Sequence, residues 1–219
     1  MLIKDWMTRE PITINDDTSM IKAIHIMKQQ RFRRLPVLHQ GRLVGVITDR
    51  DLKEASPSKA TTLDVHELYY LLGELQVKEI MTRNPVTVDM NDTVEHAAQV
   101  MLEQTISGMP VLDAHGELVG IITQSDIFRA FMHITGVRQG GVQFALRLED
   151  TPGLIKEVVD LLRARGARFV SLLSSYATSK EGFRDVYLRV KNLTPEDVAA
   201  AKDELASRFE VMYVIQEAQ

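Results

Sequence analysis

The side chains in this sequence best suited to chemistry occur in a short pattern that appears twice. A threonine is followed three residues later by an aspartate, as Thr48 with Asp51 and as Thr123 with Asp126. A carboxylate can accept two hydrogen bonds, which suits two neighbouring hydroxyls such as those of a ribose. A threonine at the start of a helix lies near free backbone N–H groups that can face a phosphate.

The same pattern also fits a helix cap, in which the side chain of Thr or Asp accepts a hydrogen bond from a backbone amide in the first turn. We favour ligand binding because the pattern is repeated after a glycine-containing strand.

This pattern is part of an internal repeat made of three separate blocks. Lys4–Ile14 returns as Lys78–Val88, Leu35–Leu38 as Met109–Leu112, and Gly41–Leu52 as Gly116–Ile127. The offset is 74 residues for the first two blocks and 75 for the third, so one residue was added in the turn before Gly116. Repeats of this kind indicate two copies of one supersecondary unit.

Each copy predicts the same series of elements. A short strand surrounds Thr13 or Thr87, and a helix follows with Ser19 or Thr93 as its N-cap. The apolar residues with helical spacing are Met20, Ile21, Ile24 and Met27 in the first copy, and Val94, Ala97, Ala98 and Met101 in the second. A hairpin comes next, with strands Leu35–Leu38 and Leu43–Thr48 in the first copy, and a second helix starts near Asp49 or Gln124. Between the copies, His66–Leu72 predicts a helical linker that covers the core.

The blocks resemble the CBS motif, and the pair resembles a Bateman module over about Met1–His133. The resemblance rests on Met-Thr-x-x-Pro-[Ile/Val]-Thr-[Ile/Val], on Pro-Val followed by an apolar residue, and on Gly, two apolar residues and Thr-x-x-Asp. It implies an α/β (α+β) fold in which two motifs pack about a pseudo-twofold axis and leave two clefts for adenosine ligands. We expect CBS motif 1 at 1–60, a linker helix at 61–76, CBS motif 2 at 77–135, a glycine-rich linker at 136–141 and a further domain at 142–219.

The resemblance also implies which residues line each cleft. The first cleft would combine Asp51, Thr48, Arg50, Arg33 and Arg34 with Thr82, Pro85, Thr87, Ile106 and Ser107. The second would combine Asp126, Thr123, Ser125 and Gly108 with Thr8, Pro11, Thr13 and Phe32. Where the first has Arg34 and Arg50, the second has Gly108 and Ser125. Because arginine pairs with phosphate in a bidentate manner, we expect the first cleft to bind a phosphorylated nucleotide more strongly. The alternative is that Arg33 and Arg34 are a solvated pair at a helix end.

The residues after 141 predict a smaller domain of order βαββαβ, a ferredoxin-like split. Thr151 and Pro152 fit the N-cap and first position of its first helix, Gly166 fits its end, and Thr194 with Pro195 starts its second helix. With Asp150-x-Pro152-Gly153-Leu154, this order resembles an ACT domain. The resemblance implies a possible amino-acid site at Asp150, Pro152, Gly153 and Leu154. The alternative is that Gly153 only permits tight loop packing and that the domain only dimerises. The whole arrangement resembles the acetoin-utilisation regulatory proteins.

Composition narrows the function. The net charge of −4 is not that of a nucleic-acid binder, and the absence of cysteine excludes thiol nucleophiles and thiolate metal sites. The six histidines form no His-x-x-x-His pair, and no hydrolase or P-loop motif occurs.

We therefore expect a regulatory sensor that is not an enzyme, that is cytoplasmic and that forms a homodimer. We expect it to bind no metal, nucleic acid or membrane. The expected ligand is AMP, ADP or ATP, with NAD or S-adenosylmethionine as other adenosine compounds, and the regulated protein is not identified. The alternatives are an interaction module, an enzyme subunit or a transcription regulator, the last disfavoured because no helix-turn-helix segment is left over.

Overall fold

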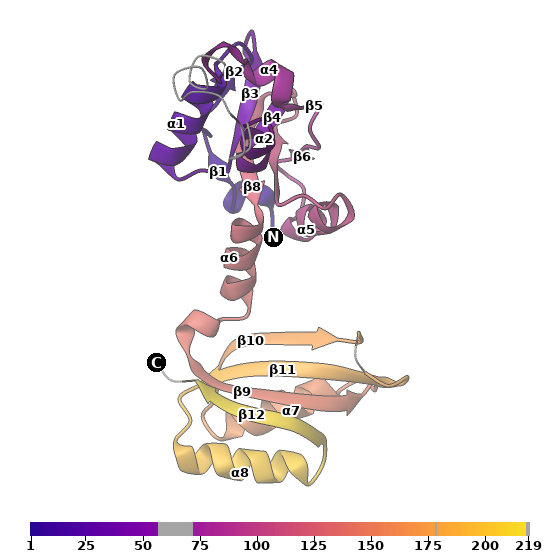
Figure 1. Ribbon diagram of the computed structural model, residues 1–219. Coiled ribbons are helices and arrows are strands. Elements are labelled where there is room, and N and C mark those ends of the chain that lie inside the picture. Colours follow the sequence, from indigo (N-terminus) through magenta and orange to yellow (C-terminus); the bar gives the residue numbers. More distant parts are fainter. Residues whose placement is uncertain (57–71, 178, 218–219) are drawn as a thin grey trace. The chain divides into compact units, whose positions relative to one another are not determined.

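The internal repeat folds into two four-stranded sheets of the same design (Figure 1), in a computed structural model that describes residues 1–56, 72–177 and 179–217. The first copy contains η1 (Ile3–Asp5), β1 (Thr8–Arg9), β2 (Ile14–Asn15), α1 (Met20–Gln30), β3 (Arg34–His39), β4 (Arg42–Thr48) and α2 (Asp49–Glu54). The second contains α4 (Val77–Ile80), β5 (Thr82–Arg83), β6 (Val88–Asp89), α5 (Val94–Glu103), β7 (Gly108–Leu112), β8 (Leu118–Thr123) and α6 (Gln124–Ile134). The chain divides into two compact units, Met1–Phe128 and Arg129–Gln219, at a point within α6.

Local signals account for most of these elements. The hydroxyl of Ser19 accepts a hydrogen bond from the amide of Lys22, and that of Thr93 from the amide of His96, so both predicted N-caps are confirmed. The predicted hairpins form as β3 with β4 and as β7 with β8, both antiparallel. The predicted linker helix at His66–Leu72 lies almost wholly outside the described residues.

The two sheets of the N-terminal unit exchange their first strands. Strand β1 pairs with β8 of the second copy, where Thr8 lies opposite Ile121, and β5 pairs with β4 of the first copy, where Thr82 lies opposite Val46. The sheet orders are therefore β2-β3-β4-β5 and β1-β8-β7-β6. Each copy thus supplies an edge strand to the other copy's sheet.

The residues just before these strands follow the same exchange. Ile3 donates its backbone N–H to the carbonyl of Asp92 at 2.9 Å and is fully buried in the core of the second copy. Val77 donates to the carbonyl of Thr18 at 2.8 Å and is fully buried in the core of the first copy. Burial of one such side chain contributes about 1.5–3 kcal/mol, so each copy depends on the other for part of its stability.

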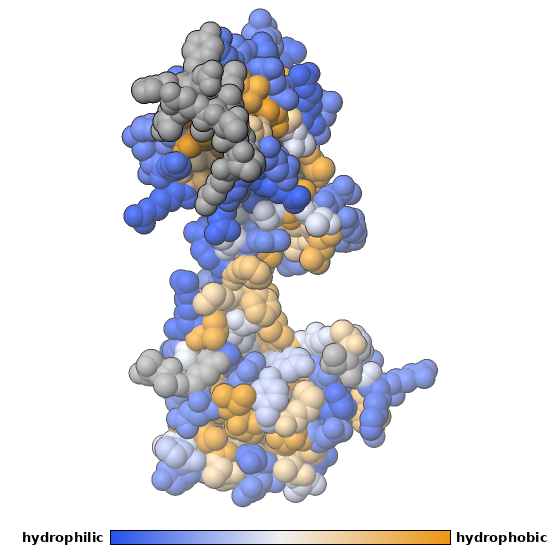
Figure 2. Space-filling view, viewed as in Figure 1, coloured by the Kyte–Doolittle hydropathy of each residue, from blue (hydrophilic) through white to orange (hydrophobic). Residues whose placement is uncertain are grey.

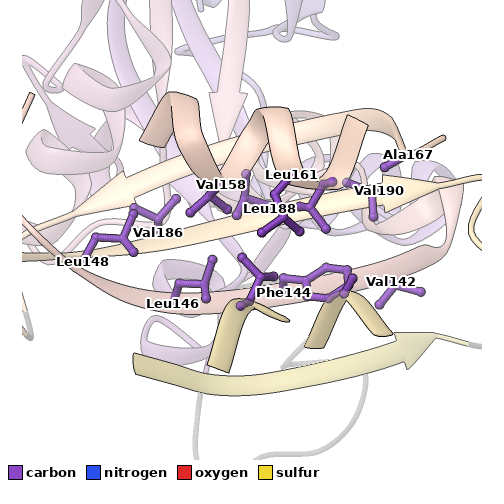
Figure 3. Close-up of a cluster of buried hydrophobic side chains, with 13 residues drawn as sticks. Val142, Phe144, Leu146, Leu148, Val158, Leu161, Ala167, Val186, Leu188 and Val190 are labelled. Carbon is purple, nitrogen blue, oxygen red and sulfur yellow. The ribbon is translucent and has the colours of Figure 1, made fainter. Parts of the chain in front are cut away.

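The C-terminal unit is a four-stranded antiparallel sheet with two helices. Its elements are η2 (Val137–Gln139), β9 (Gly141–Glu149), α7 (Leu154–Ala164), β10 (Arg168–Ser175), β11 (Phe183–Lys191), α8 (Pro195–Ala206) and β12 (Glu210–Glu217). The strand order β10-β11-β9-β12 together with the order βαββαβ is the split β-α-β arrangement that the sequence predicts. Alternate residues of β9 and β11 point toward the helices and form a core with α7 and α8, part of which Figure 3 shows.

Helix α7 starts later than the sequence predicts. The N-cap is Gly153, with φ of +99°, and neither Thr151 nor Pro152 is helical. The assignment of Thr151 as N-cap and Pro152 as the first helical residue is therefore wrong. The Thr-Pro pair resembles the true start of α8, where Thr194 caps Asp197 in a reciprocal capping box. After Pro152, however, a glycine with a left-handed backbone conformation turns the chain into the helix.

Within the described ranges, no helix is long and apolar enough to cross a membrane.

Two equivalent glycines let the exchanged strands approach their sheets. A Cβ added at Gly45 would lie 3.0 Å from the carbonyl oxygen of Thr82 and 3.0 Å from Cγ of Met81. One added at Gly120 would lie at the same distances from the carbonyl oxygen of Thr8 and Cγ of Met7. Both glycines are buried, and the nearby carbonyl oxygens belong to the exchanged strands, so an added Cβ would press on the strand pairing itself.

We therefore predict that Gly45→Ala and Gly120→Ala each lower the free energy of unfolding by about 1–3 kcal/mol, the usual cost of overpacking. Urea denaturation measures the effect. The control is Gly73→Ala, since a Cβ at that exposed position would meet, among the described residues, just Cδ1 of Ile21 at 3.9 Å. A loss of stability in Gly73→Ala equal to that in Gly45→Ala would contradict the role assigned to the strand exchange.

Candidate functional site

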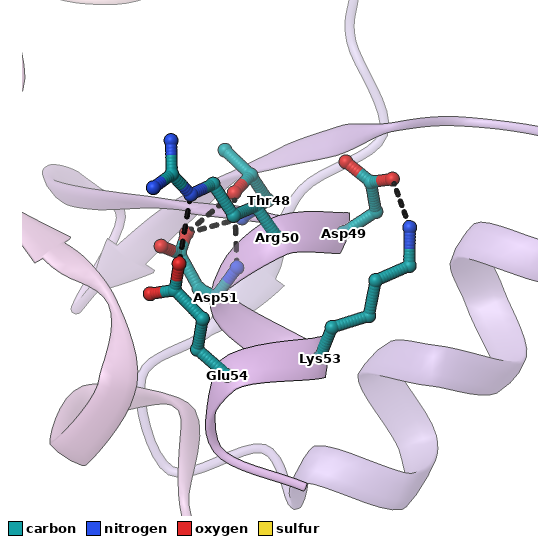
Figure 4. A network of polar contacts seen from close by, with 6 residues as sticks. All are labelled: Thr48, Asp49, Arg50, Asp51, Lys53 and Glu54. Carbon is teal, nitrogen blue, oxygen red and sulfur yellow. Dashed lines mark hydrogen bonds and ion pairs between the residues drawn. The ribbon is translucent and has the colours of Figure 1, made fainter.

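The start of α2 holds the first Thr-x-x-Asp pair in a closed hydrogen-bonded arrangement (Figure 4). The backbone N–H and the hydroxyl of Thr48 both donate to Oδ2 of Asp51, at 2.7 and 2.8 Å. The amide of Asp51 donates in return to Oγ1 of Thr48 at 3.3 Å, which completes a capping box. The second carboxylate oxygen, Oδ1 of Asp51, has no hydrogen-bond partner among the described residues. The cap interpretation of this pattern is therefore confirmed, and one oxygen stays available to a ligand.

The second pair has nearly the same geometry at the start of α6. The backbone N–H and the hydroxyl of Thr123 each donate to Oδ2 of Asp126 at 2.7 Å. Asp126 is only 2% exposed, whereas Asp51 is half-buried. A buried carboxylate needs such donors, because an unsatisfied one is costly to remove from water.

The segments between the exchanged strands and the following strands pass from one sheet to the other. Thr82 lies on the sheet that contains Thr48, whereas Val88 lies on the sheet that contains Thr123. Pro85 and Thr87 therefore lie in the crossing, and Pro11 and Thr13 occupy the same place in the first copy, after Thr8. The two sheets are therefore connected by two equivalent crossings, one after Thr8 and one after Thr82.

These crossings carry unusual backbone and side-chain features. Glu10 and Asn84, which precede the two prolines, have φ of +48° and +47°, a region that non-glycine residues seldom adopt. The next residue after each proline is a large exposed apolar residue: Ile12 is 40% and Val86 is 39% exposed. Hydrophilic residues dominate the visible surface of this unit in Figure 2, so exposed apolar side chains at two equivalent positions suggest a surface for an apolar ligand group.

A second pair of equivalent positions follows helices α1 and α5. Arg31 and Thr105 have φ of +56° and +54°, and each is followed by an apolar residue. Phe32 is 41% exposed, whereas Ile106 is half-buried and packs against the second core. The two copies therefore differ in how much apolar surface they present here.

The predicted arginines occupy different environments. Nε of Arg50 donates to Oε1 of Glu54 at 2.8 Å, and the Arg50 side chain is 84% exposed, so this guanidinium lies on the helix surface. The side chain of Arg33 is exposed as well. Arg34 instead crosses to the second copy, where Nη2 donates to Oγ of Ser107. Burial lowers the pKa of the Arg34 guanidinium from its ordinary value, although the carboxylates of Asp49 and Asp126 act in the opposite direction.

The contacts of Arg34 involve residues that the sequence assigned to both clefts. The sequence predicts Ser107 in the first cleft and Gly108 in the second. In the structure, the side chain of Arg34 fills the space that a side chain at residue 108 would occupy. Ser125 is exposed on the first turn of α6. The structure thus brings Arg34, Ser107 and Gly108 together, whereas Arg50 pairs with Glu54 on its own helix. The sequence missed this contact because no local pattern connects residues 34 and 108.

Comparison with known proteins identifies the N-terminal unit. The family model for the CBS domain matches residues 3–58 and 77–133. The chain belongs to the CBS domain family. A CBS domain-containing protein of Dictyostelium discoideum is 37% identical over 128 residues, which are 58% of this chain and 88% of that protein.

Solved structures of CBS domain proteins give the same result. The CBS domain pair of the protein MJ0100, in complex with 5′-methylthioadenosine and S-adenosyl-L-methionine, is 33% identical, with a TM-score of 0.50, over 60% of this chain and 95% of that one. CBSX2, an Arabidopsis thaliana protein, in complex with AMP is 31% identical, with a TM-score of 0.50, over 61% of this chain and 97% of that one. A Vibrio cholerae protein provisionally assigned to acetoin utilization (AcuB) is 26% identical, with a TM-score of 0.52, over 64% and 96%.

The candidate amino-acid site of the C-terminal unit is partly closed by its own side chains. Arg184 donates to the carboxylate of Asp150 and to the hydroxyl of Tyr176, and its guanidinium lies 4.9 Å from the centre of the Tyr176 ring. The Asp150 contact raises the pKa of Arg184. By contrast, a Cβ at Gly153 would meet no atom of the described residues within 4 Å, Pro152 is exposed, and Leu154 packs against the core. Within the described residues, no group of three His, Cys, Asp or Glu side chains could hold a metal ion.

The two capping arrangements lead to a stability prediction. Thr48→Ala and Thr123→Ala should each lower the free energy of unfolding by about 0.5–2 kcal/mol, because each removes a hydroxyl that hydrogen-bonds to the aspartate in the first turn of the helix. Chemical denaturation followed by circular dichroism measures this. Ser125→Ala is the control, since Ser125 is an exposed residue in the first turn of α6 and alanine favours a helix. Unchanged stability in both threonine variants would argue against the caps.

Proposed function

We propose that the CBS pair is a regulatory module that binds an adenine nucleotide at the two Thr-x-x-Asp sites. The observation that carries the proposal is the matched hydrogen-bonding geometry of these two sites, in a unit whose two crossings carry exposed apolar residues at equivalent positions. Adenosine is the chemical group common to AMP, 5′-methylthioadenosine and S-adenosyl-L-methionine, the molecules in complex with the CBSX2 and MJ0100 structures. We therefore propose the AMP, ADP and ATP class, with S-adenosylmethionine and NAD as further members to be tested.

Each part of the ligand would have a chemically suited partner. Oδ1 of Asp51 can accept a hydrogen bond from a ribose hydroxyl, and we propose the same role for Asp126. Ile12 and Val86 would cover an adenine ring, which removes their apolar surface from water. Arg34, the partly buried guanidinium, would pair with phosphate oxygens through charge-assisted hydrogen bonds. None of these roles requires a bond to be made or broken, so we propose a non-catalytic sensor that acts on another protein.

A panel of ligands tests this proposal. We predict that AMP, ADP or ATP raises the melting temperature of the full chain by several degrees at about 100 times its Kd, since that concentration contributes about 2.7 kcal/mol. Asp51→Ala and Asp126→Ala should each weaken binding in calorimetry, whereas Asp17→Ala, at an exposed position in the same unit, should not. No response to any adenosine compound would reject the proposal.

We propose that the C-terminal unit is an ACT-like domain, as in acetoin-utilisation regulators, and that it pairs two chains. Its strand β12 is an edge strand and exposes Tyr213 and Ile215, which are 38% and 48% accessible. An edge strand with apolar residues is a template for pairing with another chain. The space beside Gly153 would suit a small amino acid, although a ligand amine would compete with Arg184 for Asp150. A cytoplasmic location stays a prediction.

The expected dimer can be measured directly. Light scattering at micromolar concentration should give twice the chain mass of 24.8 kDa. Ile215→Lys should shift the mass toward the monomer, because it places a charge on the proposed contact. Lys202→Glu, at an exposed residue of α8, is the control and should leave the mass unchanged. A monomeric mass for the unmodified chain would contradict pairing.

A further inference from the structure

Arg34 and Gly108 hold equivalent places in the two copies and meet each other. Arg34 begins β3 and lies opposite Thr48, whereas Gly108 begins β7 and lies opposite Thr123. A Cβ at residue 108 would overlap Nη1 of Arg34. One copy therefore supplies a guanidinium at this place, and the other supplies the space into which it fits.

The position of the guanidinium puts it beside both helix starts. The carbonyl of Arg33, the preceding residue, accepts a hydrogen bond from the amide of Asp49, the first residue of α2, at 2.9 Å. In the second copy the carbonyl of Ser107 accepts from the amide of Gln124, the first residue of α6, at 3.1 Å. Since Arg34 donates to the Ser107 hydroxyl, its backbone lies next to one Thr-x-x-Asp site and its charged end next to the other.

The surrounding charges fit a cation between two sites. Asp49 of the first copy and Asp126 of the second both interact electrostatically with Arg34. The equivalent position in the second copy is a glycine, so this pair of positions supplies one guanidinium to two carboxylate-bearing helix starts, with the charge of Arg33 acting against it. An arginine that pairs with a phosphate in a bidentate manner directs the two parallel N–H groups of its rigid fork toward that one anion, so the same pair of donors is not offered to the other side.

We propose that Arg34 is a single cation shared by the two ligand sites, so that a phosphate bound at one site withdraws it from the other. This inference rests on the proposed nucleotide binding and specifies its regulation. Phosphorylated ligands would bind with negative cooperativity, whereas adenosine, which lacks a phosphate, would bind both sites independently. Loss of a charge-assisted hydrogen bond at the second site should weaken it at least about tenfold, which corresponds to about 1.4 kcal/mol.

Calorimetry of the full chain with AMP and with adenosine tests the proposal. We expect two AMP binding steps that differ about tenfold or more, and no such difference for adenosine. Arg34→Gln should bring the two AMP affinities together and leave adenosine binding unchanged, which also shows that the variant is folded. Arg42→Gln is the matched control, because it removes an exposed arginine charge of the same copy that belongs to neither cleft, and it should keep the AMP difference.

Single-site variants distinguish a shared cation from two sites that are merely unequal. In Asp126→Ala only the first site remains, and in Asp51→Ala only the second. If Arg34 is shared, the remaining site in each variant should bind AMP with the affinity of the tighter step, since nothing competes for the guanidinium. If the sites are independent and unequal, one of the two variants should bind AMP only weakly.

The outcomes separate this inference from the proposed function. AMP binding to both sites with equal affinity, a difference that persists in Arg34→Gln, or adenosine binding at one site alone would each overturn the shared cation while leaving nucleotide binding intact. Absence of binding for both AMP and adenosine in the unmodified chain would instead reject the proposed function, and the inference with it.

Discussion

The exchange of the first strands is the constraint on which the rest of the N-terminal unit depends. Each copy places its entry segment on the other copy's sheet and buries one apolar residue, Ile3 or Val77, in the other copy's core. Neither sheet has its four strands unless both copies are present. The crossings between the sheets, where Ile12 and Val86 are exposed, exist only because of this exchange. The candidate site is thus a property of the pair and not of either motif.

The capping residues show how one side chain can serve both the fold and a site. Asp51 and Asp126 each use Oδ2 to receive two hydrogen bonds from the preceding threonine, which holds the carboxylate in a fixed orientation. A carboxylate fixed in this way loses little conformational freedom when a ligand binds, so more of the interaction energy remains for affinity. The helix cap and the ligand site are therefore compatible interpretations of one pattern.

Much of the fold could be predicted from the sequence because it depends on short-range signals. Caps at Ser19, Thr93 and Thr194 and the hairpin turns are local, and the repeat indicated two copies of one unit. The exchange of β1 and β5 could not be predicted in this way, since it pairs residues far apart in the chain and no local preference distinguishes it from pairing within a copy. The start of α7 was misplaced because Thr151-Pro152 has the sequence of a helix start, and the left-handed conformation of Gly153 overrides it. The contact of Arg34 with Gly108 depends on how the two sheets face each other, which sequence periodicity does not contain.

Strand exchange also sets the order in which this unit can be completed during synthesis. The sheet of the first motif lacks its edge strand until Thr82 and Arg83 have been made, and β1 must wait for Gly120 and Ile121. Strand β1, which is made before the strands it must pair with, is thus among the last strands of this unit to find its partner. Such non-local pairing requires the closure of long loops before any contact is gained, which slows folding. Until then, the apolar side chain of Ile3 has no core of its own to enter, and it stays exposed to other chains.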